Sequence, residues 1–534
     1  MSVAQTFGVL ALLSIVVASP IQSRSSKSQS IQWVDCLDNI PAPIQEANVT
    51  LPSPLPDTLK CGYLTVPLDY SKPICESNSL NISFAANFVD SSNGLLFYNP
   101  GGPGEEARSY AWALAGLSIE QISHVDGLQD FDFVAIDTRG TWSSNAFNCS
   151  AANFTLPINT PLSESEYSLL GENIESYIKD CASTTSPQGL YDHVGSDAVA
   201  QDYESVRAAL GYDKLNYLGY SYGTIYGQEY LKRFPNNVGR FILDGVASFS
   251  QSNLDFLTGQ SNDFNRLLER AEAYCQYNST ACPLASLGNG SVTATWEQVI
   301  KQYSDPAASN GTVSSGDIAA LTSVGLFSGT PRFLSFIGAI ALAATGNVTA
   351  FQYEGTEFAA AFTDSSLAVS SPTLCADFQI DDASYEGYKS LIENAKSGDK
   401  YGASYGIFDT LAAVCAFWPS TAAADLKSRY NTVTDKEYLI VSSDYDLNTP
   451  AEFSDIVMTY SPHATHIARH GDDHGSFYVP GPVRDAMLDY LYNGTIPKPT
   501  QQDIYSVYGP GQNKSVIANP YIAPIGAVAG DITE

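Results

Sequence analysis

One short segment constrains the fold of this chain more than any other. Tyr217–Gly223 reads Tyr-Leu-Gly-Tyr-Ser-Tyr-Gly, an apolar strand that runs into Gly-x-Ser-x-Gly, and a helix-like stretch follows over Thr224–Phe234. A glycine on each side of Ser221 permits the sharp strand-to-helix turn that lifts a serine hydroxyl above the edge of an α/β sheet. This context makes Ser221 a candidate nucleophile. The alternative is a serine in an ordinary glycine-lined turn.

Strand and helix patterns alternate on both sides of this segment. A helical pattern over Ala198–Leu210 lies between two strands, and a final amphipathic helix is expected over Pro482–Tyr492. Strands alternating with helices predict a mostly parallel, doubly wound α/β sheet. The expected strands are Tyr63–Pro67, Ile82–Val89, Leu95–Tyr98, Phe131–Ile136, Leu215–Gly219, Arg240–Leu243, Glu437–Ser442 and Thr465–Ala468.

Strand patterns fade between about residues 250 and 430, where Ala-, Leu- and Ser-rich helical stretches dominate. Because a strand resumes at Glu437, we interpret this block as a helical cap inserted into the sheet domain, not as an independent domain. A cap over a catalytic face would exclude water and shape the pocket. The expected organisation is a signal peptide (1–19), an N-terminal segment (20–60), the first part of the core (61–250), the cap (251–430), the second part of the core (431–497) and a surface tail (498–534).

Composition and sequence signals favour an extracellular protein. The 534 residues include 57 acidic and 26 basic side chains, a net charge of −31, which disfavours nucleic acid and anionic membranes as partners. Phe7–Ala18 is an apolar run of the length of a secretory signal, too short to cross a bilayer. Nine cysteines and the Asn-x-Ser/Thr sequons suit an oxidising compartment. Cys275 with Cys282 and Cys375 with Cys415 are plausible disulfides, and the odd count leaves one thiol unpaired. The ten sequons are at Asn48, Asn81, Asn148, Asn153, Asn278, Asn289, Asn310, Asn347, Asn493 and Asn513.

A serine nucleophile needs a base, and six histidines are available. In doubly wound hydrolases the acid follows a late strand and the histidine follows in a later loop. Asp444 and Asp446 both come after the strand that ends at Ser442, and His474 lies 28 residues beyond Asp446. The order predicts His474 as the base and one of the two aspartates as the acid.

A metal site is the alternative interpretation of the same region. His463, His466, His470 and His474 lie near Asp472 and Asp473, at spacings that would place them along one helix face. The surrounding sequence is more typical of a turn and a strand, which scatters these rings. We therefore expect His463, His466 and His470 to be surface or packing residues.

The transition state of acyl transfer needs backbone N–H donors for its oxyanion. Tyr222 follows the nucleophile directly and would supply one. The second is expected after an early strand, where the chain reads Tyr-Asn-Pro-Gly-Gly-Pro-Gly over residues 98–104. Gly102 is the candidate donor, because glycine lets a substrate approach the main chain closely. No Gly-Lys-Ser/Thr follows this loop, so a phosphate-binding role is not indicated.

The chain resembles the α/β-hydrolase superfamily and, within it, the proline iminopeptidase and tripeptidyl aminopeptidase-like serine peptidases. The resemblance covers about residues 60–497, and its most specific motifs lie in the sheet domain. It implies that Asp446 is the acid, because the family's aspartate stands three residues before Thr-Pro. The matching segments are residues 64–70, 99–104, 137–140, 215–223, 446–450, 474–477 and 489–491, with Cys375-Ala376-Asp377 and 415–419 as landmarks of the cap.

The chain departs from that family directly after the glycine loop. Glu105 and Glu106 stand where the family carries more glycine and serine, and Trp142 stands where a second glycine often follows Arg-Gly. A carboxylate near the active serine would recognise the free ammonium of an exopeptidase substrate. Plain charge complementarity at a helix N-terminus explains the two glutamates equally well. Asp377 in the cap is a weaker candidate for the same task.

These features together predict a secreted serine hydrolase, an aminopeptidase that acts through an acyl-enzyme on Ser221. The expected ligand is a peptide or a small acyl substrate, and the chemistry needs no metal or organic cofactor. The first alternative is an ester, lactone or amide hydrolase of secondary metabolism with the same three residues. The second is a hydrolase fold that has lost catalysis and serves as a binding module.

Overall fold

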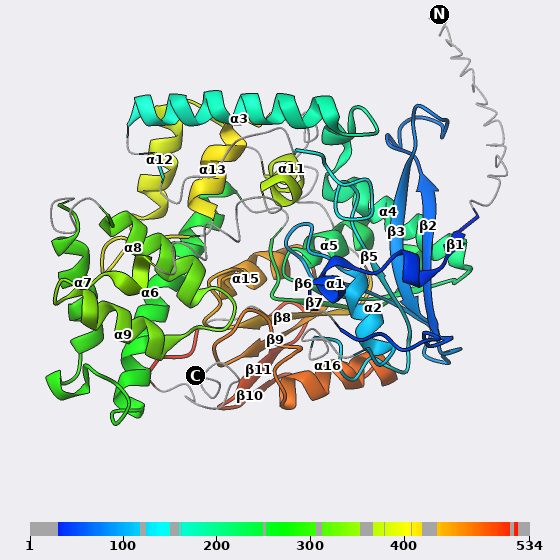
Figure 1. Cartoon of the computed structure of the whole chain (residues 1–534). Coiled ribbons are helices and arrows are strands. Elements are labelled where there is room, and N and C mark those ends of the chain that lie inside the picture. The colour runs from blue at the N-terminus through cyan, green and yellow to red at the C-terminus, as the bar shows by residue number, and fades with distance from the viewer. Residues whose placement is uncertain are drawn as a thin grey trace, which may run out of the picture.

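The computed structural model describes residues 30–47, 49–117, 124–149, 160–161, 163–248, 252–305, 312–352, 367–378, 380–406, 408–418, 435–512 and 517–521. The expected signal peptide and the sequons at Asn48, Asn153, Asn310 and Asn513 lie outside these residues. The framework is an 11-stranded sheet in the order β1-β2-β3-β5-β4-β6-β7-β8-β9-β11-β10 (Figure 1).

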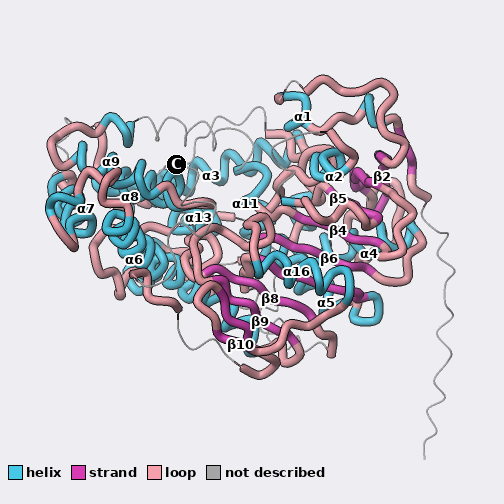
Figure 2. Tube along the Cα trace, turned by 90° about the horizontal axis from the view of Figure 1, so that it is seen from below, coloured by secondary structure: helices cyan, strands magenta, loops and turns pink. Residues whose placement is uncertain are grey.

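The six strands from β5 to β9 in this order are parallel, and the strands outside them pair antiparallel. Figure 2 shows β4, β6, β8, β9 and β10 as successive ribbons of this sheet. All eight strands expected from the sequence are present, to within a few residues at their ends. The bounds are β1 Gln32–Val34, β2 Leu59–Val66, β3 Leu80–Asn87, β4 Leu95–Asn99, β5 Asp132–Ile136, β6 Leu215–Tyr220, β7 Val238–Asp244, β8 Tyr438–Ser443, β9 Ala464–Arg469, β10 Thr500–Gln501 and β11 Tyr505–Tyr508.

Helices cover both faces of the sheet, because its central strands are apolar on both sides. On one face α4, α5 and α15 share a buried cluster with β6 and β7. On the other face α2 and α16 pack against β4, β5 and β8. The bounds are α2 Arg108–Leu114, α4 Ser196–Leu210, α5 Gly223–Arg233, α15 Ala451–Thr459 and α16 Pro482–Asn493.

The described residues between β7 and β8 contain helices and no strand, as the sequence predicted. One group of these helices, α6 to α9, has its own apolar core around Phe264 and Trp296. None of the helices among the described residues has the length and hydropathy that crossing a membrane requires. The bounds are α6 Asn253–Tyr277, α7 Ser291–Gln302, α8 Ser315–Leu321, α9 Phe333–Ala343, α11 Leu367–Asp377, α12 Tyr385–Ala395 and α13 Phe408–Ala416.

The helical layer begins earlier in the chain than the sequence suggested. Helix α3 (Glu164–Thr184) precedes the expected insertion, yet it lies across α12 and α13 in Figure 1. Tyr167 of α3 stacks on Tyr388 of α12 at 5.2 Å and contacts Phe417 at 4.7 Å between ring centroids. The expected cap boundary at residue 251 therefore misses one of its helices.

The sheet also continues past residue 497, where we expected only a surface tail. Strand β11 pairs antiparallel with β9, from Tyr505 opposite Arg469 to Tyr508 opposite His466, and β10 then pairs with β11. The expectation was wrong here because these strands are only two and four residues long, too short for an alternating pattern to mark them.

Four disulfides connect loops and helices of the described chain. Cys275–Cys282 and Cys375–Cys415 are present as the sequence suggested, together with Cys36–Cys61 and Cys149–Cys181. Cys75 is the remaining thiol and is exposed. Cys375–Cys415 joins α11 to α13, which fixes one helix of the layer against another.

A buried guanidinium joins the loops around the core. Arg139 follows β5 and is fully buried, with its Nε and Nη2 bonded to the Asp202 carboxylate of α4 at 2.7 and 2.6 Å. Its remaining donors bond the carbonyl oxygens of Pro67, Leu68 and His193 at 2.8–3.1 Å. Without the guanidinium the three carbonyl oxygens lose this donor, and the Asp202 carboxylate is left with the Tyr70 hydroxyl at 2.8 Å. This residue thus connects the end of β2, the segment before α4 and α4 itself.

We expect the substitution Arg139→Met to destabilise the fold by about 3–5 kcal/mol, because it strands a buried carboxylate and three carbonyls. Denaturant unfolding and the thermal midpoint would measure this loss. Lys72→Gln is the matched control, since it removes a surface ion pair with Asp69 and should leave both quantities unchanged. Equal stability of Arg139→Met and wild type would contradict the role assigned to Arg139.

Candidate active site

Ser221 occupies a strained turn between β6 and α5. It has a φ of +55°, a value that L-residues other than Asn and Asp rarely adopt. Its N–H donates to the carbonyl oxygen of Asp244 on the neighbouring strand β7 at 2.9 Å. The side chain is only partly buried. A strained, supported and accessible serine at the end of a central strand is the geometry that the motif predicted.

The glycines on either side of Ser221 are required by close contacts. A Cβ at residue 219 would lie 2.6 Å from the carbonyl oxygen of Gly223, and a Cβ at Gly223 would lie 2.7 Å from the carbonyl oxygen of Asn99. Neither neighbour is a flexible side chain, so no small shift would relieve these contacts. The glycines therefore let β6, the turn and the loop after β4 approach each other.

The glycine loop after β4 lies directly against the serine turn. A Cβ at Gly101 would be 2.8 Å from the Ser221 Cβ and 3.0 Å from the backbone nitrogen of Tyr222. The Asn99 side chain accepts the N–H of Gly101 at 3.0 Å, and Gly102 is exposed with a φ of +104°. The two segments expected to supply oxyanion donors, Gly102 and Tyr222, are thus neighbours beside the serine.

His474 and Asp446 form a buried pair. The Nδ1 atom of His474 lies 2.9 and 3.0 Å from the two carboxylate oxygens of Asp446. That carboxylate also accepts the N–H groups of Asn448 and Thr449 at 3.0 Å and the Thr449 hydroxyl at 2.8 Å. The Gly475 N–H reaches it at 3.2 Å. These donors fix the orientation of the carboxylate, which faces the Nδ1 atom of the imidazole.

Tyr220, the residue before Ser221, contacts His474 and so connects the histidine to the serine turn. The Tyr220 ring packs on the His474 ring at 4.9 Å between centroids, and its hydroxyl donates to the His474 carbonyl oxygen at 2.5 Å. In the part of the chain that the structure describes, no direct hydrogen bond joins the Ser221 hydroxyl to His474. Hydrogen bonds between nucleophile and base are often looser before substrate binds.

Asp444, the other aspartate left open by the sequence, has a different partner. Its Oδ2 atom is 2.7 Å from Nδ1 of His470, whose Nε2 is 2.8 Å from the Ser506 hydroxyl. His466 is fully buried and bonds the Ser442 hydroxyl at 2.8 Å, and His463 is exposed. The structure therefore separates two Asp–His pairs, and only Asp446–His474 adjoins the serine turn. Within the described ranges no three His, Cys, Asp or Glu side chains are grouped closely enough to hold a metal ion.

Asp244 is a site residue that the sequence analysis missed. Its carbonyl oxygen accepts the Ser221 N–H, and its buried carboxylate accepts the N–H groups of Ser476 and Phe477 at 2.7–3.0 Å. One residue thus holds both the serine turn and the loop of His474. Burial raises the pKa of Asp244 to about 6, although these N–H bonds oppose the rise. The sequence feature that could have identified Asp244 is its position at the end of β7, the strand next to β6.

Aromatic rings surround the catalytic side of His474. His124 stacks on Tyr478 at 4.7 Å and meets Tyr220 edge-on at 5.8 Å, and Tyr110 lies 6.2 Å from His124. Burial, with a smaller contribution from His474, lowers the pKa of His124 to about 4. His124 is therefore neutral at physiological pH and adds apolar surface to this wall. The local sequence around His124 does not predict this position, because its neighbours come from distant segments.

The two glutamates after the glycine loop have different surroundings. Glu105 is exposed beside the loop, and desolvation raises the pKa of its carboxyl. Glu106 is 3% exposed and accepts the N–H of Ser109 at 3.0 Å, with Arg108 at 3.5 Å. Burial, followed by the nearby Asp137 carboxylate, raises the pKa of Glu106 to about 7. Both residues stay predictions as substrate contacts, and of the two Glu105 is the exposed one.

Asp377 is also buried, at 1% exposure, and its carboxylate is occupied. It accepts the Tyr222 hydroxyl at 2.7 Å and the Ser196 N–H at 3.1 Å. In this structure its carboxylate is bonded within the protein, and the expectation that Asp377 contacts substrate stays a prediction.

Comparison with known proteins agrees with this geometry. Residues 94–328 match the family described as alpha/beta hydrolase fold, and residues 405–504 match the family described as TAP-like protein. Serine protease Hip1 of Mycobacterium tuberculosis is 31% identical over 48% of this chain and 47% of its own length. Tripeptidyl aminopeptidase of Streptomyces coelicolor is 33% identical over 42% of this chain and 40% of its own. The chain thus matches less than half the length of these two relatives.

A solved structure, the proline iminopeptidase of Mycobacterium smegmatis, aligns over 81% of this chain and 93% of its own at 11% identity and a TM-score of 0.32. That likeness is too distant to add to the assignment. The two family matches together cover more than half of the chain, and they include the serine turn and the Asp446–His474 pair. We conclude that the chain belongs to the α/β-hydrolase superfamily, and that its residues 405–504 match the family of TAP-like proteins.

Proposed function

We propose that this protein is a serine hydrolase that acts through an acyl-enzyme on Ser221. The observation that carries the proposal is the Asp446–His474 pair, buried beside the strained serine turn. His474 takes the proton of the Ser221 hydroxyl as that oxygen attacks the substrate carbonyl. Asp446 accepts the hydrogen bond of the His474 Nδ1–H group and stabilises the imidazolium that forms.

The remaining steps use the same groups in reverse roles. The N–H groups of Gly102 and Tyr222 bind the oxyanion that develops on the carbonyl oxygen. His474 then gives its proton to the leaving amine or alcohol, and the acyl group stays on Ser221. A water molecule, deprotonated by His474, attacks the acyl-enzyme. The bond between the acyl carbon and the Ser221 oxygen then breaks, His474 returns its proton to that oxygen, and the acid is released. Atoms and protons balance without any cofactor.

We further propose that the substrate is a peptide with a free N-terminus. Two relatives are named as a serine protease and a tripeptidyl aminopeptidase. Glu105 supports the exopeptidase assignment, since it is an exposed carboxylate beside the oxyanion loop, and its N–H bonds the Gly101 carbonyl at 3.2 Å. A carboxylate there would pair with the ammonium of a short peptide whose carbonyl reaches Ser221.

We also propose an extracellular location. Four disulfides join the described segments, as is typical of oxidising compartments. Six sequon asparagines lie in the described chain, and all but the half-buried Asn278 are exposed, so glycans could attach without disturbing the core. The other five are Asn81, Asn148, Asn289, Asn347 and Asn493.

Incubation with a peptide ladder tests the exopeptidase assignment. Mass spectrometry should show short N-terminal fragments released from free peptides and none from acetylated ones. Glu105→Gln should raise KM for free peptides about tenfold, the scale of one exposed charge-assisted contact. Glu106→Gln is the matched control, because the Glu106 carboxylate is buried against Arg108 and Ser109. Equal cleavage of acetylated and free peptides would refute the exopeptidase assignment, and turnover of simple esters alone would favour the small-molecule alternative.

The pH dependence of KM provides a second test of Glu105. Desolvation raises the pKa of Glu105 above the ordinary 4.5. The carboxylate therefore becomes neutral as the pH falls through that raised value. The contact with an ammonium is then lost, and KM for an aminoacyl substrate should rise toward acid pH. KM for an amine-free ester should not show this rise, nor should KM of Glu105→Gln with either substrate. Parallel KM profiles for both substrates in wild type would contradict the proposal.

Substitution of the acid separates the two Asp–His pairs. Asp446→Asn should lower kcat by about 10³–10⁴-fold, because an amide favours the wrong imidazole tautomer. The same change in Asp444, which faces His470, should leave kcat close to that of wild type. Steady-state kinetics on an activated ester would measure both variants. The opposite ranking would assign the acid to Asp444.

A further inference from the structure

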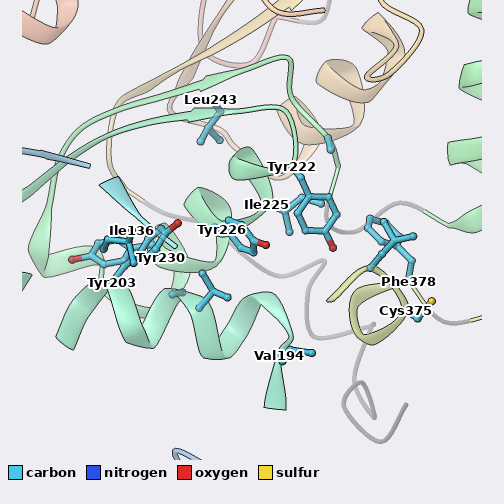
Figure 3. Close-up of a cluster of buried hydrophobic side chains, with 14 of the residues drawn as sticks. Ile136, Val194, Tyr203, Tyr222, Ile225, Tyr226, Tyr230, Leu243, Cys375 and Phe378 are labelled. Atoms are coloured by element: carbon cyan, nitrogen blue, oxygen red, sulfur yellow. The ribbon is translucent and has the colours of Figure 1, made fainter. Parts of the chain in front are cut away.

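One helix of the helical layer contacts both segments of the expected oxyanion hole. At the C-terminal end of α11, the Asp377 carboxylate accepts the Tyr222 hydroxyl at 2.7 Å. Nearer its start, the Ser370 hydroxyl donates to the carbonyl oxygen of Pro103 at 2.9 Å, within the glycine loop. Figure 3 shows Tyr222 facing Cys375 of this helix and Phe378, which directly follows it. Two loops that meet at Ser221 are thus held from the same side by one helix.

The carboxylate of Asp377 is itself firmly placed. It is 1% exposed, and it accepts both the N–H of Ser196, at 3.1 Å, and the Ser196 hydroxyl. Ser196 is the first residue of α4, which packs on the sheet. The disulfide between Cys375 and Cys415 fixes the same end of α11 to α13. A buried carboxylate with this many fixed donors keeps one orientation, because any other would leave it unpaired.

Tyr222 links the fixed Asp377 carboxylate to the backbone of the oxyanion hole. Its N–H is the expected oxyanion donor, and its ring is buried at 4% exposure. The ring contacts Tyr226 at 5.5 Å and Phe378 at 6.4 Å between centroids. A side chain packed on its sides and bonded at its hydroxyl has little rotational freedom, so the peptide plane before it is also restrained. Oxyanion donors contribute most when they are held in place before the reaction.

We propose that α11 is a positioning element of the oxyanion hole, with Asp377 acting through Tyr222 and Ser370 acting through Pro103. The inference rests on the proposed hydrolase function and deepens it. It makes the helical layer part of the catalytic geometry as well as a cover for the substrate. Any displacement of α11 would move both donors away from the position of the oxyanion, which lowers kcat more than substrate affinity.

Tyr222→Phe and Asp377→Asn test the proposal on p-nitrophenyl butyrate, which has no amine and so does not depend on Glu105. Each should lower kcat about 10–100-fold, less than the loss of a whole oxyanion donor, with KM nearly unchanged. Affinity for butylboronic acid, which forms a tetrahedral adduct on Ser221, should fall by the same factor as kcat. Because the two residues share one bond, the double variant should be little worse than either single variant.

Ser370→Ala provides an independent second variant, expected to lower kcat and boronate affinity in the same way. Asp382→Asn is the matched control, since this exposed aspartate bonds the N–H of Ser384 before α12 and should leave kcat unchanged. All values are expressed per active site from burst titration, because a purely structural defect lowers the number of active sites and not kcat or boronate affinity. Unchanged kcat and boronate affinity in Tyr222→Phe, Asp377→Asn and Ser370→Ala would overturn the inference alone. A wild type without ester turnover or boronate binding would instead overturn the proposed function.

Discussion

The backbone conformation of Ser221 is the constraint on which the rest of this site depends. A residue with a Cβ is held at a φ of +55°, at a cost on the order of 1–3 kcal/mol. The surrounding structure maintains it, since β6 is paired on both sides and Asp244 accepts the Ser221 N–H. Gly219 and Gly223 allow the close packing that this turn requires. The strain is local, and its effect is to present one hydroxyl at the edge of the sheet.

Parallel strand order then brings the other groups to the same edge. The glycine loop, Ser221, Asp446 and His474 follow β4, β6, β8 and β9 respectively, and Asp244 is the last residue of β7. These strands are neighbours in the sheet, and in doubly wound folds ligands bind at the carboxyl ends of the strands. Residues separated by more than 200 positions meet because the strands that precede them are adjacent and end at the same edge of the sheet. Asp244 strengthens the arrangement, because it bonds both the serine turn and the backbone after His474.

The sequence was sufficient for those parts of the fold that repeat a local pattern. The strands around Leu95 and Leu215 are mostly apolar, and the glycines around Ser221 mark the turn. Patterns failed where long-range contacts decide the structure. Strands β10 and β11 are only two and four residues long, and β11 pairs with the edge of β9. Helix α3 joins the helical layer through Tyr167, whose partners are more than 200 residues away.

The same distinction applies to the acidic residues near the site. Asp446 and Asp444 are two positions apart and could be separated by sequence only through family resemblance, whereas the structure gives each its own histidine. Glu106 and Asp377 looked like possible ammonium ligands, but Arg108 with Ser109 occupies one and Tyr222 with Ser196 occupies the other. The burial of these two carboxylates, and their partners from distant segments, cannot be predicted from the local sequence. Glu105 is exposed beside the glycine loop and stays a prediction as the ammonium contact.

Covalent labelling with a fluorophosphonate, followed by peptide mapping, tests the central claim most directly. The claim is that Ser221 is the nucleophile and that His474 activates it. We predict one phosphonyl adduct on the peptide that contains Ser221, with a rate that falls steeply in His474→Ala although the protein remains folded. An adduct on another residue, or labelling of Ser221 at an unchanged rate in His474→Ala, would contradict the account.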